Sequence, residues 1–245
     1  MRKGGTDAHN TKAEGKGREH VWRAARNDRL FGRQRQTGVC YKKGNTIDTV
    51  FDGASGYSAR LREMLQLIYP NVQLNVINAG ISGDTAEGGE KRFARDVAPY
   101  SPDLVVVGFA LNDSTRGEAG LPSYIRALES IFAQCKKIGA EIICLTPNMM
   151  NTKVSCHLCD KEFIGLAESL SALQNGGVLD KYVQAAKETA QRAGAAVCDI
   201  YGQWKKLERG GADVTELLAN KLNHPVRELH YYTAIKLIES MFEGE

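Results

Sequence analysis

The sequence has no long apolar run, no regular cysteine spacing, no internal repeat and no low-complexity tract. A membrane-spanning helix needs about 18 nearly uninterrupted apolar residues, which excludes an integral membrane protein. The basic N-terminus has no apolar stretch behind it, so no signal peptide is predicted. Six Cys in 245 residues without regular spacing do not form a disulfide scaffold. We therefore expect a cytoplasmic, single-domain protein.

Positive charge is concentrated at the N-terminus. Residues 1–36 contain ten Lys and Arg against four Asp and Glu, a net charge of +6, whereas the whole chain carries only +3. This segment has no apolar period and several glycines, which raise the entropic cost of ordering it. We expect residues 1–49 to be a basic tail, either disordered or translated in a shifted reading frame, and residues 50–245 to form the folded domain.

Strand-like and helix-like patterns alternate from about residue 56. The expected strands are residues 72–78, 103–109, 140–146 and 195–200. The expected helices are residues 61–68, 84–97, 121–138, 179–193 and 231–242, the last with Ile235, Ile238, Met241 and Phe242 turned inward. This alternation predicts an α/β fold with a parallel sheet covered by helices on both faces. Ligands bind such a sheet at the carboxyl ends of its strands.

Three segments near those strand ends can carry chemistry. Residues 78–85 form a glycine-containing turn into a helix, where free N–H groups can face an anion; the alternative is a simple turn capped by Asp84. Asn112 can donate its side-chain amide to an oxyanion, although Asn-Asp is also a common turn pair. His224, held extended before Pro225 at a helix entrance, can serve as a general base or be structural.

In this order and at these strand ends, the three segments resemble the SGNH (GDSL-type) hydrolase family. The family's second block resembles residues 78–85, its third block residues 108–113, and its last block His224-Pro225. The resemblance covers roughly residues 56–243.

The resemblance implies a flavodoxin-like three-layer α/β/α sandwich that hydrolyses esters, often acyl groups on carbohydrates, lipids or thioesters. It assigns Gly83 as an oxyanion-hole backbone donor, Asn112 as the side-chain donor and His224 as the general base. It implies Ser-based acyl transfer on small esters or acylated carbohydrates, without a metal or other cofactor.

The chain departs from the family at two points. It contains no Gly-Asp-Ser, the block that carries the nucleophile on the first strand, and no strand is expected upstream of residue 56. Ser55, Ser82 and Ser114 do not match that block, so the nucleophile is unknown and the first strand is expected to be lost or replaced. The family's Asp three residues before the His is Lys221 here; Asp213 is the alternative residue to orient the imidazole.

We therefore expect an esterase whose activity is impaired by the absence of the nucleophile block. A shifted frame over residues up to about 36 accounts for that absence, and sequencing the gene tests it. Two alternatives remain: a non-catalytic binder of acylated glycans, and a nucleic-acid-associated protein that uses the basic arm, although no aromatic residues alternate with its basic ones.

The motif Cys156-His157-Leu158-Cys159 has no second cysteine pair at the spacing of a structural zinc site. We expect two free thiols in a loop beside the substrate crevice, and no metal.

Overall fold

A three-stranded parallel sheet forms the centre of the molecule. A computed structural model describes residues 39–43, 46–50 and 52–242, with side chains from residue 52 onward. The strands β3 (Leu104–Val107), β4 (Glu141–Leu145) and β5 (Ala196–Cys198) lie in the order β3-β4-β5. All four residues of β3 are buried, as expected for a parallel strand covered on both faces. The predicted α/β class is confirmed.

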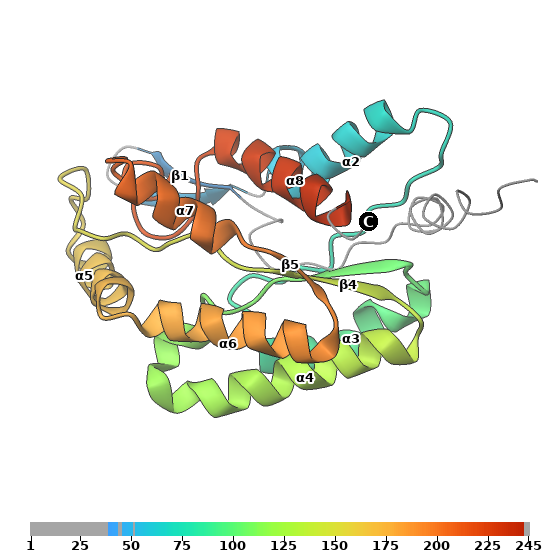
Figure 1. Cartoon of the computed structure of the whole chain (residues 1–245). Coiled ribbons are helices and arrows are strands. Elements are labelled where there is room, and N and C mark those ends of the chain that lie inside the picture. Colours follow the sequence, from blue (N-terminus) through green and yellow to red (C-terminus); the bar gives the residue numbers. More distant parts are fainter. Residues whose placement is uncertain (1–38, 44–45, 51, 243–245) are drawn as a thin grey trace, which may run out of the picture.

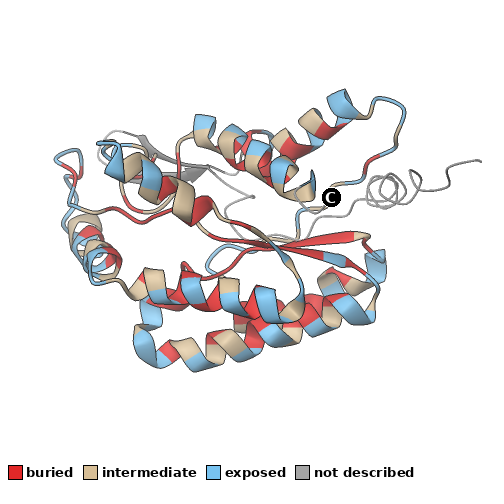
Figure 2. Ribbon diagram, in the orientation of Figure 1, coloured by how far each residue is buried: buried red, intermediate tan, exposed pale blue. Residues whose placement is uncertain are grey.

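Helices cover both faces of this sheet (Figure 1). One layer contains α3 (Ala86–Asp96), α4 (Leu121–Lys137) and α6 (Val178–Ala193), and the other contains α2 (Tyr57–Ile68), α7 (Ile200–Arg209) and α8 (Arg227–Phe242). In α5 (Lys161–Asn175), which follows the long loop after β4, Asp160 caps the first turn. Figure 2 shows buried residues on the sheet and on the helix faces turned toward it. No helix in the described part of the chain is long and apolar enough to cross a membrane.

A hairpin precedes α2, where no strand was expected. Strands β1 (Val39–Lys43) and β2 (Thr46–Val50) pair antiparallel, with Val39 opposite Val50. The prediction of no strand upstream of residue 56 is therefore wrong. The sequence signal is Gly44-Asn45, a pair typical of tight hairpin turns, followed by a segment rich in β-branched residues. The expectations for residues 1–36 lie outside the described residues.

Residues 72–78, expected as a strand, are not a strand in the structure. A strand is stable only when its backbone N–H and C=O groups pair with a neighbour, and no described strand pairs with this segment. Leu74 nevertheless packs in the core with 4% of its surface exposed.

The last helix begins earlier than predicted and buries a different face. It starts at Arg227, and its buried residues are His230, Thr233, Ala234 and Leu237. Ile238 and Met241 pack against the core as expected, but Ile235 and Phe242 are 40% and 37% exposed. Because apolar residues occur on both sides of α8, their spacing alone did not identify the inward face. The prediction also missed α5 and α7.

Candidate functional site

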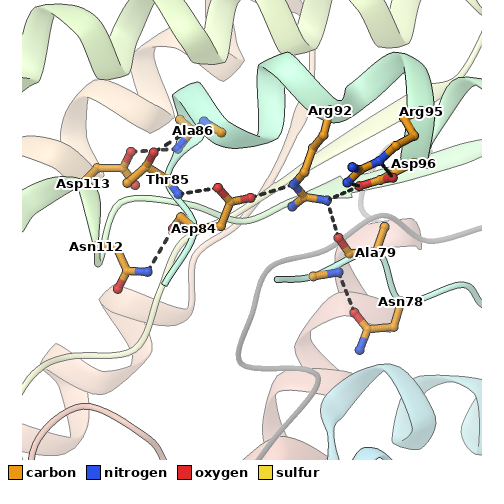
Figure 3. A network of polar contacts seen from close by, with 12 residues as sticks. Asn78, Ala79, Asp84, Thr85, Ala86, Arg92, Arg95, Asp96, Asn112 and Asp113 are labelled. Atoms are coloured by element: carbon orange, nitrogen blue, oxygen red, sulfur yellow. Dashed lines mark hydrogen bonds and ion pairs between the residues drawn. The ribbon is translucent and has the colours of Figure 1, made fainter. Parts of the chain in front are cut away.

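The loops after residue 78 and after β3 meet through one hydrogen bond. The side-chain amide Nδ2 of Asn112 donates to the backbone oxygen of Asp84 at 2.9 Å (Figure 3). Asn112 is partly buried at the start of a short 3₁₀ turn, Asp113–Arg116. The structure therefore brings Asn112 and Asp84, the residue after Gly83, together. The two loops that contain them were predicted to lie at the same edge of the sheet.

Asp113 adds two hydrogen bonds beside this contact. Its Oδ1 accepts the N–H of Ala86 at 2.8 Å, and its Oδ2 accepts the N–H of Ala110 at 2.9 Å. Ala110 has a φ of 106°, a region that costs a non-glycine residue on the order of 1–3 kcal/mol. Such strain is typical of functional sites, because the surroundings must hold the backbone in place.

Gly83 has a φ of +75°, which a residue without a side chain adopts readily. The next residue, Asp84, was expected to cap α3, but Thr85 does so by accepting the N–H of Gly88. Asp84 instead forms an ion pair with Arg92, whose Nε lies 2.7 Å from its Oδ2. Arg92 also donates to the backbone oxygen of Ala79 at 2.5 Å, so one buried guanidinium fixes both ends of the loop.

His224 lies in a loop that Asn220 organises. The Oδ1 atom of buried Asn220 accepts the N–H groups of Leu222, Asn223 and His224 at 3.1, 2.9 and 3.0 Å. Asn148, just after β4, donates to the backbone oxygen of Asn223 at 3.1 Å. These contacts attach the segment that carries His224 to the carboxyl end of β4, the strand next to β3.

Asp213 and Lys221 contact other partners. Oδ2 of Asp213 lies 2.6 Å from Nζ of Lys153, and this hydrogen-bonded cation lowers the pKa of Asp213. Lys221 has a φ of 59° and pairs with Glu216 at 2.8 Å, which lowers the pKa of Glu216. The orienting role of Asp213 toward His224 stays a prediction.

The three serines considered as nucleophiles differ in their surroundings. Oγ of Ser55 donates to Oδ2 of Asp52 at 2.8 Å, and Ser55 is only 8% exposed. Ser55 follows β2, so the argument that no strand precedes it is wrong. Ser114 is fully buried and donates to the backbone oxygen of Leu111, whereas Ser82 is exposed.

A small cavity lies where the strands β3 and β4 end. Sequence reasoning missed two of its buried lining residues, His230 and Trp204, which are 3% and 1% exposed. Their positions on α8 and α7 are those of ordinary core residues, so no sequence signal distinguished them. The cavity is lined by Tyr57, Gly108, Phe109, Leu145, Thr146, Pro147, Asn148, Ile200, Trp204, Pro225, His230 and Thr233.

Cys156 and Cys159 are free thiols with exposed side chains, as expected for their loop. Between them, Nε2 of His157 lies 4.0 Å from Oε2 of Glu216. Within the described residues, no group of three or more His, Cys, Asp or Glu side chains is arranged to hold a metal ion.

Two esterases are similar to part of the chain. An acetylxylan esterase from Geobacillus stearothermophilus is 31% identical over 102 residues, which cover 38% of this chain and 47% of the relative. Esterase TesA from Pseudomonas aeruginosa is 34% identical over 95 residues, 38% of this chain and 45% of the relative. The matched segments thus span about half the length of these relatives.

Solved structures are similar over most of the chain. An acetylxylan esterase from Geobacillus stearothermophilus has a TM-score of 0.65 at 20% identity, covering 88% of this chain and 94% of its own. An α/β hydrolase from the metagenome of Lake Arreo has a TM-score of 0.65 at 22% identity, with the same coverage. These similarities show the fold.

The family comparison covers more of the sequence than either named relative. A model described as the GDSL-like lipase/acylhydrolase family matches residues 40–230, a span that includes both loops of the Asn112 junction and the segment of His224. The chain therefore belongs to the GDSL-like lipase/acylhydrolase family.

Proposed function

We propose that this protein is an SGNH-type ester hydrolase for small esters or acylated carbohydrates, and that its activity is impaired as the sequence stands. The hydrogen bond from Asn112 to Asp84 is the observation that carries the proposal, because it orients a side-chain amide beside the Gly83 turn. The family membership and the two relatives named as esterases support the reaction class.

In the proposed reaction, a serine hydroxyl attacks the carbonyl carbon of the ester while His224 takes its proton. The carbonyl oxygen becomes negative and accepts hydrogen bonds from the Asn112 amide and the Gly83 N–H. The bond to the alcohol then breaks, and His224 returns the proton to the alcohol oxygen. Water repeats both steps and releases the acid.

The nucleophile is the missing part of this proposal. The sequence contains no Gly-Asp-Ser, and triad members act as a unit, so a base and an oxyanion hole alone retain only a small part of the catalysis. We further propose that the parent fold is the flavodoxin-like three-layer sandwich, with its first strand lost or replaced here.

Turnover of p-nitrophenyl acetate tests both parts of this proposal. We expect a rate far below the roughly 10 s⁻¹ of a typical enzyme, yet above the uncatalysed reaction by up to about 10³-fold. Asn112→Ala removes one oxyanion donor and lowers the residual rate by about 100-fold. Asn175→Ala, which removes an exposed amide bonded to the Thr152 backbone, is the matched control and leaves the rate unchanged.

A fluorophosphonate probe separates the outcomes further. The impaired enzyme is not labelled, whereas an intact esterase labels on a single serine. Labelling of Ser55 that disappears in Ser55→Ala would overturn the proposed impairment. Equal residual rates in Asn112→Ala and in the unaltered protein would overturn the oxyanion assignment.

A small, partly open and mostly apolar cavity, which can receive an acyl group, and the absence of a matching nucleophile block favour a second candidate, a non-catalytic binder of acylated glycans. Calorimetric titration with acetylated xylooligosaccharides distinguishes it. A binder takes up the acetylated sugar without hydrolysis and loses affinity for the deacetylated one.

A further inference from the structure

The cavity at the ends of β3 and β4 is small and partly open to the surface. Its volume is about 50 Å³, and of its lining residues only Pro147 is not buried. A single water needs roughly 10–15 Å³ measured in this way, whereas a cavity of about 150 Å³ holds benzene. The space therefore accommodates several heavy atoms but not an aromatic ring or a sugar.

The cavity wall is mostly apolar and carries no Asp, Glu, Lys or Arg. Aromatic rings of Phe109 and Trp204 form part of it, and the ring of His230 stacks on Tyr57 with centroids 6.3 Å apart and planes 13° from parallel. The hydroxyl of Thr233 donates to the backbone oxygen of Leu229. A mostly apolar wall without Asp, Glu, Lys or Arg disfavours a charged occupant and favours a neutral, mainly aliphatic one.

Three lining residues connect the cavity to the proposed reaction site. Gly108 and Phe109 directly precede the strained Ala110, and Asn112 lies two residues after Ala110. Pro225 directly follows His224. The cavity therefore lies between the segment that presents the oxyanion donor and the segment that presents the base.

We propose that this cavity is the acyl pocket of the protein and restricts it to acyl groups of two to four carbons. The inference rests on the proposed ester chemistry and adds the identity of the acyl group and the residues that select it. Gly108 and Ile200 limit the length of the chain, and Trp204 closes the wall on the side of α7.

Gly108 offers a precise test. A methyl group at this position would lie 3.5 Å from the backbone oxygen of Leu145 and 3.6 Å from its Cβ, which is ordinary contact distance. Gly108 does not have a positive φ, so alanine fits its backbone. Gly108→Ala therefore takes up cavity volume without a clash. Gly165→Ala, on α5 with no atom within 4 Å of the added Cβ, is the matched control.

The experiment measures binding of N-methylacetamide, N-methylbutyramide and N-methylhexanamide to the full chain by the fluorescence of Trp204. Trp22→Phe leaves Trp204 as the sole tryptophan, since the sequence has two. Because a ligand of so few atoms makes few contacts, the titration extends to 100 mM of each amide. We expect N-methylacetamide and N-methylbutyramide to bind and N-methylhexanamide to bind at least tenfold more weakly.

The variants sharpen the result. Gly108→Ala weakens the binding of N-methylbutyramide at least fivefold, and Gly165→Ala leaves this binding unchanged. Ile200→Val enlarges the cavity by one methyl group and improves the binding of N-methylhexanamide. Equal binding of all three amides, no binding at 100 mM, or equal effects of the two glycine substitutions would overturn the proposal.

This test is independent of catalysis. If the amides bind with the expected length dependence but Asn112→Ala does not change the residual esterase rate, the proposed reaction is wrong and the proposed acyl pocket still stands. If the rate depends on Asn112 but the amides do not bind, the acyl pocket fails and the proposed reaction remains.

Discussion

The carboxylate of Asp113 and the amide of Asn112, neighbours in sequence, connect β3 to the same loop from two sides. Asp113 accepts the N–H of Ala86 at 2.8 Å, and Asn112 donates to the oxygen of Asp84 at 2.9 Å. The first contact lies at the start of α3 and the second at the turn before it. Asn112 is thus held in a position that Asp113 determines.

Asp113→Ala should reduce the free energy of unfolding by about 2–5 kcal/mol, because it leaves the buried N–H groups of Ala86 and Ala110 without an acceptor. Asp113→Asn retains one acceptor oxygen and should cost about half as much. Urea unfolding monitored by circular dichroism measures both.

Glu87→Ala is the control for that series. Glu87 pairs with Arg116 at the surface, where solvent screening leaves an ion pair little effect on stability. If Asp113→Ala reduces the free energy of unfolding no more than Glu87→Ala does, Asp113 does not bridge the two loops.

Stability should fall when the solution is acidified, in part through Asp96. Hydrogen bonds from Arg95, and then from Arg92, lower the pKa of Asp96 below its ordinary value of 3.8. A carboxylate with a lowered folded-state pKa stabilises the fold above the unfolded value, and this contribution disappears as the pH falls through the folded value.

The comparison of Asp96→Asn with the unaltered protein measures this contribution. We expect the variant to be less stable by about 1 kcal/mol at pH 7, and the difference to vanish near pH 2. Glu168→Gln, at an exposed position of α5, is the matched control. A difference between Asp96→Asn and the unaltered protein that stays constant from pH 7 to pH 2 would contradict the assignment.

The sequence predicted those parts of the fold that local patterns determine. Continuous apolar runs located β3 and β4, and helical spacing located α4 and α6, because burial on both faces or on one stripe leaves a clear period. Residues 72–78 have a strand-like pattern too, but pairing depends on a neighbour that no local pattern encodes. For the hairpin of β1 and β2, a local turn signal was present but was missed. It lay in residues 1–49, which were assigned to a tail because of their composition.

For the candidate site, the sequence indicated which residues meet but not how they are supported. The roles of Asn112 and Gly83 came from the family resemblance; Asn112 does follow β3, whereas residues 72–78, the strand expected before Gly83, do not form a strand. The support from Arg92 and Asn220 depends on side chains that reach across loops, and neither has a sequence signature. His230 and Trp204 could not be recognised because a cavity exists only in three dimensions.

Asn220→Ala should release the loop that carries His224. It removes the oxygen that accepts three backbone N–H groups, from Leu222, Asn223 and His224, at a cost of about 2–4 kcal/mol. Hydrogen exchange at these three amides should accelerate at least tenfold. Asn220→Asp keeps the acceptor and should restore most of the protection; equal exchange in both variants would contradict this role.

The five cysteines whose side chains the structure describes should separate into two reactive and three unreactive thiols. Cys156 and Cys159 are exposed, whereas burial raises the pKa of Cys135 and of Cys144 to about 12. Cys198 is 1% exposed. Because the thiolate is the reacting species, the buried thiols react slowly at any neutral pH.

Titration with 5,5′-dithiobis(2-nitrobenzoate) at pH 8 measures this difference after prior reduction and removal of the reductant. In a Cys40→Ser variant, which excludes the one cysteine outside the described side chains, we expect two thiols to react within minutes and three more only in denaturant. Adding Cys156→Ser and Cys159→Ser should abolish the fast phase. Three or more fast thiols in Cys40→Ser would show that the core around Cys135, Cys144 or Cys198 opens readily, contrary to the burial of these residues.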